Sequence, residues 1–303
     1  MTARPIQEVC VVGAGFMGSQ IGLQCAVHGR AVRLHDVSES VLAKAAQCQA
    51  EILDQSIRTG LVPADQRESI LARIRFSSSL EDSVAGVELA IEAVNEDLHL
   101  KRELFRTLDR VCAPHVILAT NSSSLRVSRI EDVTGRPDKL LNTHFVQRVW
   151  EHPFVELMRG SQTSDATFEA VRAFVLSIGL VPILVRREVT GFILARIWRA
   201  VKKEALHLVD IGAATPEDID RMWMIAWETS PGPFGLMDRI GLDVIRDIEQ
   251  VYCEESGDPS DAPPRVLLDK IDRGELGVKT GQGFYTYPNP SYQSPGFLRE
   301  ASP

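Results

Sequence analysis

The stretch Val9-Cys10-Val11-Val12-Gly13-Ala14-Gly15-Phe16-Met17-Gly18 decides the fold of this chain. A short apolar run ends there in the pattern GxGxxG, and an apolar periodic segment follows as far as Val27, where Gly29 stops it. A second predicted strand, Ala31-Val32-Arg33-Leu34-His35, leads to Asp36. The order strand, glycine turn, helix, strand and acidic residue predicts a parallel βαβ unit that binds a dinucleotide.

Each glycine of this pattern has its own task in a dinucleotide-binding turn. Gly13 permits the tight turn, Gly15 lets a pyrophosphate approach the backbone, and Gly18 lets the helix pack against the strand. Asp36 lies near the position whose carboxylate accepts the hydroxyls of the adenosine ribose. A 2′-phosphate would meet like charge there, and residues 37–38 supply no arginine. We therefore expect NAD rather than NADP. The alternative to a dinucleotide-binding site is a glycine-rich turn in some other α/β protein.

The composition is that of a folded globular protein. The 303 residues exceed the size at which single hydrophobic cores stop growing, so two domains are expected. A net charge of −8 without any basic stripe argues against nucleic acid as a partner. Neither a membrane-spanning apolar stretch nor a secretion leader is recognisable, and a cytoplasmic location is expected. The five cysteines lack ligand spacing, which predicts reduced thiols and no metal site.

The chain after Asp36 continues as an α/β protein and then becomes helical. Residues 38–74 read as a polar helical excursion, interrupted at 60–63. Apolar runs then predict five more strands, at residues 87–93, 116–120, 140–145, 154–158 and 180–185. Helices are expected between them at 98–111 and 166–178, and beyond them at 192–211, 216–227, 234–240, 242–255 and 265–271. The predicted fold class is therefore α/β, with an N-terminal Rossmann-type doubly wound sheet (residues 1–188) and an all-helical C-terminal domain (residues 189–303).

One histidine is placed as a general base would be. An NAD enzyme that oxidises a secondary alcohol needs a group to take the hydroxyl proton, and histidine suits that near neutral pH. His144 closes the strand that begins at Leu140, and Glu156 follows within the next strand. A strand-turn-strand arrangement would set this carboxylate against the imidazole. A purely structural His–Glu pair is the alternative.

Motifs along nearly the whole chain resemble those of the L-3-hydroxyacyl-CoA dehydrogenase family, in the family's order. The superfamily also includes enzymes acting on free hydroxy acids. The motifs are Gly13-x-Gly15-x-x-Gly18, Glu92-Ala93-Val94-Asn95-Glu96-Asp97, Ala119-Thr120-Asn121-Ser122-Ser123-Ser124-Leu125, His144-Phe145, Phe154-Val155-Glu156-Leu157, Gly191-Phe192-Ile193, Gly232-Pro233 with Asp238-Arg239-Ile240-Gly241-Leu242-Asp243, and Lys279-Thr280-Gly281-Gln282-Gly283-Phe284-Tyr285.

The resemblance implies roles for individual residues and partners. The substrate would be a hydroxyacyl group, linked to CoA or to a carrier protein, and the setting fatty acid metabolism. The helical domain would form a homodimer and close over the substrate. By the same resemblance His144 would be the general base, Glu156 its partner, Ser123 the hydroxyl that bonds the substrate oxygen, Glu96 and Lys101 neighbours of the nicotinamide ribose, and Lys279 a neighbour of the cofactor in the closed form.

Three positions depart from the family pattern and bear on the substrate. Where the family reads His-Phe-Phe-Asn-Pro, this chain has Gln147 and Arg148, and where it reads Gly-Phe-x-x-Asn-Arg, the asparagine is replaced by Ala195. Losing an amide that aligns a substrate carbonyl indicates a changed substrate. Arg148 is either a receptor for a carboxylate or a solvated surface residue.

Three functions therefore stay open. The first is an NAD-dependent oxidoreductase that interconverts an L-3-hydroxyacyl-CoA, or a related 3-hydroxyacyl group, and its 3-oxo form. The second is an enzyme of the same fold acting on a free or carrier-bound hydroxy acid, which the three departures favour. The third is a catalytically retired NAD-binding protein. Retention of His144, Glu156 and Ser123 together argues against retirement.

Overall fold

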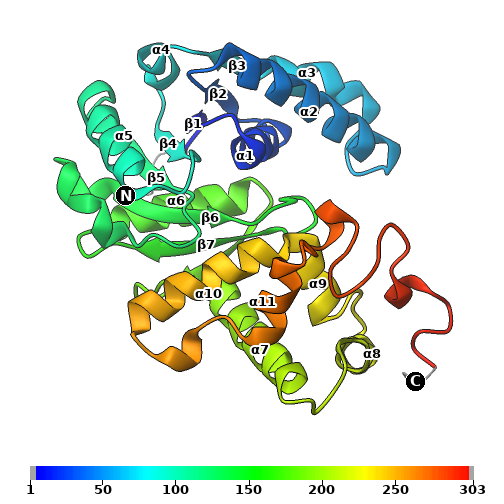
Figure 1. The fold of residues 1–303 in the computed structure, drawn as a ribbon. Helices are drawn as coiled ribbons and strands as arrows, with labels where there is room; N and C mark the ends of the chain where they lie inside the picture. The colour runs from blue at the N-terminus through cyan, green and yellow to red at the C-terminus, as the bar shows by residue number, and fades with distance from the viewer. Residues whose placement is uncertain (1–4, 300–303) are drawn as a thin grey trace. The chain divides into compact units, whose positions relative to one another are not determined.

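The computed structural model describes residues 5–299, and the chain divides into two compact units after Ala195. The N-terminal unit holds one eight-stranded sheet in the order β3-β2-β1-β4-β5-β6-β7-β8 (Figure 1). All neighbouring strands are parallel except the antiparallel pair β6 and β7. The strands are β1 (Glu8–Val12), β2 (Ala31–His35), β3 (Ile74–Ser77), β4 (Leu89–Glu92), β5 (Ile117–Thr120), β6 (Leu140–Phe145), β7 (Phe154–Arg159) and β8 (Val181–Val185).

Helices cover both faces of this sheet. The α-helices of the unit are α1 (Phe16–Val27), α2 (Glu39–Arg58), α3 (Arg67–Ala72), α4 (Leu80–Val84), α5 (Leu98–Val111) and α6 (Asp165–Ser177). Short 3-10 turns are η1 (Ala64–Gln66), η2 (Val127–Arg129), η3 (Glu131–Val133) and η4 (Pro137–Lys139). The chain passes from β1 to β2 on one side and returns to β4 on the other, which creates the switch point where such sheets bind ligands.

Alternation along the strands builds two hydrophobic cores. Because successive side chains of a strand point to opposite faces, Val9 and Val11 of β1 pack with α1, α2, α3 and α6, whereas Cys10 and Val12 pack with α4 and α5. All four side chains are at most 2% exposed. Strands buried on both faces read as continuous apolar runs, which is why β1 was recognisable in the sequence.

The segment between β2 and β4 contains one strand and one helix that the sequence did not predict. The sequence predicts helix over residues 38–74 with an interruption at 60–63, and α2, η1 and α3 fill most of that range on either side of the interruption. However, Ile74–Ser77 forms the edge strand β3 beside β2, and α4 follows it; the sequence analysis placed neither. In β3 Ile74 is buried while Arg75 and Phe76 are exposed, so the strand lacks the apolar run that marks the others.

The C-terminal unit is helical, as predicted. Its elements are α7 (Leu194–Asp210), which begins at the end of the N-terminal unit, α8 (Pro216–Trp227), α9 (Pro233–Ile240), α10 (Leu242–Ser256), α11 (Arg265–Asp272) and the 3-10 turns η5 (Pro259–Asp261), η6 (Val278–Thr280) and η7 (Ser291–Gln293). Between residues 196 and 299 the only β pairing described is a set of isolated bridges around Gln282. Leu206, Phe234 and Leu267 lie at the centre of its core.

Two buried aspartates join the helices of this unit to its C-terminal segment. Asp220 of α8 accepts the amides of Phe234 and Gly235 at 2.7 and 2.8 Å and the Tyr285 hydroxyl at 2.9 Å. Asp238 of α9 accepts the amides of Phe284 and Tyr285 at 2.9 and 2.8 Å. The motifs near Gly232 and Lys279 therefore build the scaffold of the helical unit, because they place hydrogen-bond donors around two buried carboxylates.

Residues 5–299 contain neither a helix suited to the membrane nor a cluster of metal-binding side chains. No helix there is both long and apolar enough to cross a membrane. No group of three or more His, Cys, Asp or Glu side chains in that range could hold a metal ion. The cysteines are free thiols, and burial raises the pKa of Cys25 to about 12.

Candidate active site

The glycine turn is shaped by packing at two positions and left open at the third. Gly13 has φ +104°, and a Cβ there would lie 2.6 Å from the carbonyl oxygen of Ala93. A Cβ on Gly18 would lie 1.8 Å from the carbonyl oxygen of Gly13. In contrast, a Cβ on Gly15 would meet no described atom within 4 Å. The turn thus has space on the side where a pyrophosphate would approach.

Asp36 closes the other side of this turn. Its carboxylate accepts the amides of Ala14 and Ser38, each at 3.0 Å. Helix α1 begins after Gly15 without a side-chain cap, so the amides of its first turn are available to an anion. Open space, an uncapped helix start and an acidic acceptor beside them fit a dinucleotide with a free ribose 2′-hydroxyl.

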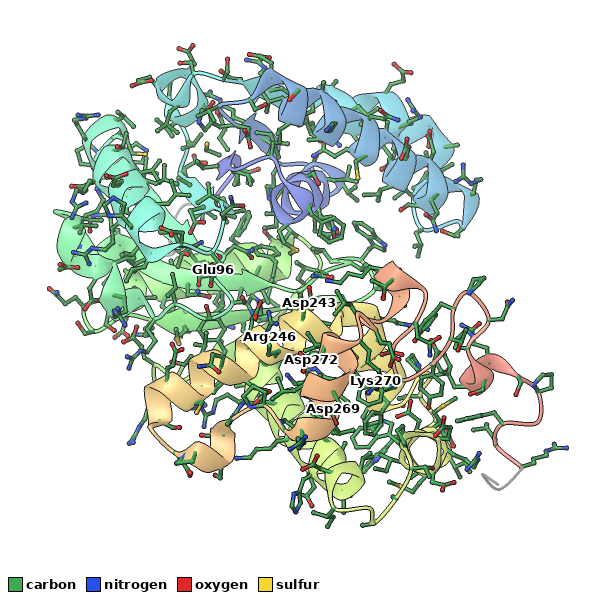
Figure 2. The ribbon with its side chains drawn as sticks, viewed as in Figure 1. Glu96, Asp243, Arg246, Asp269, Lys270 and Asp272 are labelled. Atoms are coloured by element: carbon green, nitrogen blue, oxygen red, sulfur yellow. The ribbon has the colours of Figure 1, made fainter. Side chains whose placement is uncertain are left out.

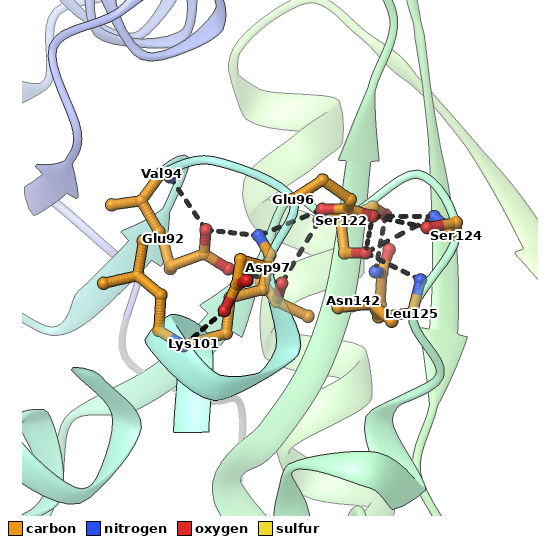
Figure 3. Close-up of polar contacts among 11 residues, drawn as sticks. Glu92, Val94, Glu96, Asp97, Lys101, Ser122, Ser124, Leu125 and Asn142 are labelled. Atoms are coloured by element: carbon orange, nitrogen blue, oxygen red, sulfur yellow. Dashed lines mark hydrogen bonds and ion pairs between the residues drawn. The ribbon is translucent and has the colours of Figure 1, made fainter. Parts of the chain in front are cut away.

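Glu96 lies just beyond β4 and is the centre of a polar network (Figures 2 and 3). Its carboxylate pairs with the Lys101 ammonium at 3.2 Å and accepts the Ser124 hydroxyl and amide at 2.7 and 3.1 Å. It also accepts the Ser122 hydroxyl. Burial raises the pKa of Glu96, but the bonds to Lys101, Ser122 and Ser124 lower it overall. The Glu96 side chain stays 37% exposed and is therefore within reach of a ligand.

Lys101, in contrast, is enclosed. Its side chain is 1% exposed, and its ammonium lies 2.5 Å from Glu92 and 3.2 Å from Glu96. Glu92, the last residue of β4, is fully buried and accepts the Thr120 hydroxyl at 2.6 Å. Burial raises the pKa of Glu92, against the opposing effect of Lys101. Glu92 is not among the site residues predicted from the sequence, although a carboxylate that ends an apolar strand is the signal that could have identified it.

The three serines after β5 differ from one another. Ser122 is 1% exposed and Ser124 is half-buried, whereas Ser123 between them is exposed. Two asparagines join this turn to β6. The Asn142 amide donates to the Ser122 carbonyl at 2.9 Å, and the Asn121 side chain accepts the Phe145 amide at 2.8 Å. The turn that carries Ser123 is thereby fixed beside the end of the strand that carries His144.

His144 and Glu156 face each other across the antiparallel pair β6 and β7. The sheet register places them directly opposite, and His144 Nδ1 lies 2.9 Å from Glu156 Oε2. Glu156 is 1% exposed and His144 9%. Directly opposed residues of antiparallel strands have adjacent side chains, so the backbone register alone brings the two groups together.

The second oxygen of Glu156 holds the backbone that leads into α7. Oε1 accepts the amides of Ile193 and Leu194 at 2.8 and 2.9 Å. Burial disfavours the charged form of Glu156, but the bonds from His144, Leu194 and Ile193 lower its pKa overall. Phe192, whose backbone has φ +48°, is buried with its ring 5.4 Å from the imidazole. His144 is thus held at one nitrogen by Glu156 and packed against the ring of Phe192, a contact that the sequence did not predict.

The departures from the family pattern lie in two places. Gln147 is exposed, and its carbonyl accepts His152 Nδ1 at 2.8 Å. Arg148 has φ +56°, donates its amide to Gln20 Oε1 at 2.8 Å and pairs its guanidinium with Glu151 at 2.8 Å. Its side chain is 53% exposed, which favours the solvated-surface interpretation.

The other two residues singled out from the sequence lie after Phe192. Ala195 is half-buried at the end of the N-terminal unit. Lys279 belongs to the C-terminal unit, where its ammonium pairs with Asp243 of α10 and lowers the pKa of that carboxyl. Figure 2 labels Asp243.

Comparison with known proteins agrees with this architecture. The family described as "3-hydroxyacyl-CoA dehydrogenase, NAD binding domain" matches residues 8–189, and "3-hydroxyacyl-CoA dehydrogenase, C-terminal domain" matches residues 191–287. A probable 3-hydroxybutyryl-CoA dehydrogenase of Bacillus subtilis is 35% identical over 282 residues, covering 93% of this chain and 98% of its own. A 5-formyl-3-hydroxy-2-methylpyridine 4-carboxylate 5-dehydrogenase of Mesorhizobium japonicum is 28% identical, covering 93% and 91%.

Among solved structures, the (S)-3-hydroxybutyryl-CoA dehydrogenase of Ralstonia eutropha is similar over the whole fold. It superposes with a TM-score of 0.88 at 36% identity, covering 94% of this chain and all of that one. The family match spans both units, and the dinucleotide turn fits the cofactor that the family description names. The chain therefore belongs to the 3-hydroxyacyl-CoA dehydrogenase family and is an NAD-dependent oxidoreductase.

Proposed function

We propose that this protein interconverts an L-3-hydroxyacyl-CoA and its 3-oxo form, with His144 as the general base and Glu156 as its partner. The observation that carries the proposal is the 2.9 Å contact between His144 Nδ1 and Glu156. It assigns the Nδ1 proton to the shared hydrogen bond and leaves Nε2 to act on the substrate. Bound NAD supplies the acceptor for the hydride.

The proton of the substrate hydroxyl passes to His144 Nε2 as the alcohol is oxidised. The imidazolium formed in this way is stabilised by the Glu156 carboxylate, whose lowered pKa keeps it charged at neutral pH. In the reverse direction the imidazolium returns the proton to the 3-oxo oxygen. The Ser123 hydroxyl, exposed at the neighbouring turn, is proposed to donate a hydrogen bond to the same oxygen and to polarise the C–O bond.

The proposed cofactor-binding residues follow the geometry of the glycine turn. Gly15 and the start of α1 receive the pyrophosphate, Gly13 and Gly18 maintain the turn, and Asp36 receives the adenosine ribose. On the family resemblance, the nicotinamide side is assigned to Glu96, with Lys101 behind it, and to Lys279.

A second substrate class has support from the sequence. Ala195 removes one amide, and Gln147 replaces another with a longer one. The Mesorhizobium relative is named for a pyridine carboxylate rather than a CoA ester. Against a free acid, the guanidinium that would receive its carboxylate is already paired with Glu151. The CoA thioester is therefore the first choice, and a free or carrier-bound hydroxy acid is the second.

One assay separates these possibilities. NADH absorbance is followed with matched panels of hydroxyacyl-CoAs, free hydroxy acids and carrier-bound hydroxyacyl groups. Turnover of the hydroxyacyl-CoAs alone supports the CoA thioester as substrate. Turnover of free hydroxy acids by the wild type, with loss of that turnover in Arg148→Met, supports the free acid. A protein that binds NADH but turns over neither class is a retired enzyme.

We also propose a homodimer built on the helical unit, working in the cytoplasm as part of fatty acid metabolism. Val244, Ile248 and Val251 are 37–47% exposed and recur at helical spacing along α10 within that unit. Free thiols fit a reducing compartment. We propose the boundary between the two domains at residues 188 and 189, as the sequence predicts. Light scattering of Val251→Asp, with Gln250→Asp as the charge-matched control, tests the dimer: only the first should dissociate.

A further inference from the structure

We infer that Ser122, Ser124 and Glu96 are positioning residues that present the Ser123 hydroxyl to the substrate. The inference rests on the proposed function, because it needs Ser123 to contact the reacting oxygen. It assigns to Lys101 and Glu92 the task of holding Glu96, without contact with the cofactor. Figure 3 labels the two glutamates, the lysine and the two outer serines at the ends of β4 and β5.

The serine turn is fixed by its outer members. The Ser122 hydroxyl donates to Glu96 and accepts the Leu125 amide at 2.8 Å. Ser124 donates both its hydroxyl and its amide to the same oxygen of Glu96, Oε1. The hydroxyl of Ser123 makes no hydrogen bond to residues 5–299 and is left facing solvent. Two tethered neighbours therefore determine where the free hydroxyl points.

The carboxylate that tethers the serines is itself held by a closed ring of contacts. The Lys101 ammonium bridges Glu96 and Glu92, and the Thr120 hydroxyl donates to the other oxygen of Glu92. The Ser122 amide donates to the Thr120 hydroxyl at 3.2 Å, which returns the ring to the serine turn. Every member of this ring has a partner, and a fully satisfied polar network rigidifies its surroundings.

Charge and exposure explain why Lys101 acts through Glu96. The lysine side chain is 1% exposed and its ammonium is shared between two carboxylates, whereas the Glu96 side chain is 37% exposed. A ligand at the strand ends can therefore reach Glu96 but not Lys101. The lysine charge lowers the pKa of Glu96 and keeps it an acceptor for the serine donors.

The test measures coupling between the outer serines and Ser123. The double variant Ser122→Ala/Ser124→Ala should lower kcat for reduction of acetoacetyl-CoA by about 10- to 100-fold, since a misplacement of about 1 Å has effects of that size. The KM for NADH should stay within about twofold, because the Lys101 ammonium still holds the Glu96 carboxylate on the nicotinamide side of the site. Ser122→Thr/Ser124→Thr keeps both hydroxyls and should restore most of the rate.

A matched control removes a similar hydrogen bond elsewhere in the same unit. The Ser177 hydroxyl donates to the Phe174 carbonyl at 2.7 Å in α6, so Ser177→Ala should leave kcat unchanged. In a Ser123→Ala background, replacing the outer serines should cause no further loss, because their effect passes through the missing hydroxyl.

The outcomes separate the inference from the proposed function. Equal losses with and without Ser123, or full kcat in the double variant, would overturn the positioning role. Failure of threonine to restore the rate of the alanine double variant would do the same. A wild-type protein that reduces no 3-oxoacyl-CoA would instead overturn the proposed function.

Discussion

Glu156 binds the imidazole of His144 with one oxygen and the amides of Ile193 and Leu194 with the other. One buried carboxylate thus orients the proposed base and fixes the residues that lead into α7. Removing its charge should disturb the imidazole while keeping the shape of the side chain.

Glu156→Gln should lower kcat, by less than His144→Ala does, because an uncharged partner no longer stabilises the imidazolium or specifies its tautomer. The wild type has a second expected property. Because the pKa of Glu156 is lower in the folded protein, the stability from this group is present above pH 4.5, the ordinary pKa, and is lost as pH falls through the folded pKa. Acid unfolding of the wild type and of Glu156→Gln, followed by fluorescence, should show that the variant loses less stability as the pH falls.

His144→Ala should lower kcat by about 10²- to 10⁴-fold with NADH affinity nearly intact, because the base touches the substrate and not the nucleotide. His152→Ala is the matched control, since His152 Nδ1 only contacts the Gln147 carbonyl in an exposed loop. Loss of turnover in the control with retention in His144→Ala would show that the base has been assigned to the wrong histidine.

Asp36→Ala should weaken NADH binding by about tenfold or more, through loss of a charged acceptor for the ribose. The Ala14 and Ser38 amides lose their acceptor as well, which loosens the turn. Fluorescence titration should find NADPH binding far more weakly than NADH in the wild type. Equal affinities would remove the basis for NAD selectivity.

Ala195→Asn combined with Gln147→Asn should raise kcat/KM on 3-hydroxybutyryl-CoA if a thioester is the substrate. Each restored bond to an otherwise unpaired acceptor is worth about 1–3 kcal/mol. Ala195→Leu adds volume without an amide and should give no gain. A wild-type kcat of about 10–1,000 per second on that substrate would show that the departures are tolerated.

Asp220→Asn should remove a pH dependence from the stability of the helical unit. Burial raises the pKa of Asp220 from 3.8 to about 6, so the folded protein binds more protons than the unfolded one between these values. Unfolding free energy should therefore fall as pH rises from about 4 to 6. Urea titrations at several pH values in this range give the free energy of unfolding, which should vary less with pH in Asp220→Asn than in the wild type. An equal pH dependence in both proteins would contradict the prediction.

Sequence patterns were sufficient where the deciding interaction is local. The turn at Gly13 and Gly18 needs residues without a Cβ, and apolar runs mark strands that are buried on both faces. The edge strand Ile74–Ser77 was not predicted, because only Ile74 of its side chains is buried and the strand contains no apolar run. The order of motifs identified the family, which the comparisons confirmed over residues 8–287.

By itself, the sequence determined the dinucleotide turn, the two-part fold and the residue types of the site. The tertiary structure decided which of those residues meet. Only the β6–β7 register places Glu156 opposite His144, and only the packing of β4 against β5 places the exposed Glu96 among the serines while enclosing Lys101. The physical reason is that hydrogen bonds and ion pairs depend on distances between groups far apart in the chain, and these distances are set by strand pairing and core packing rather than by local spacing.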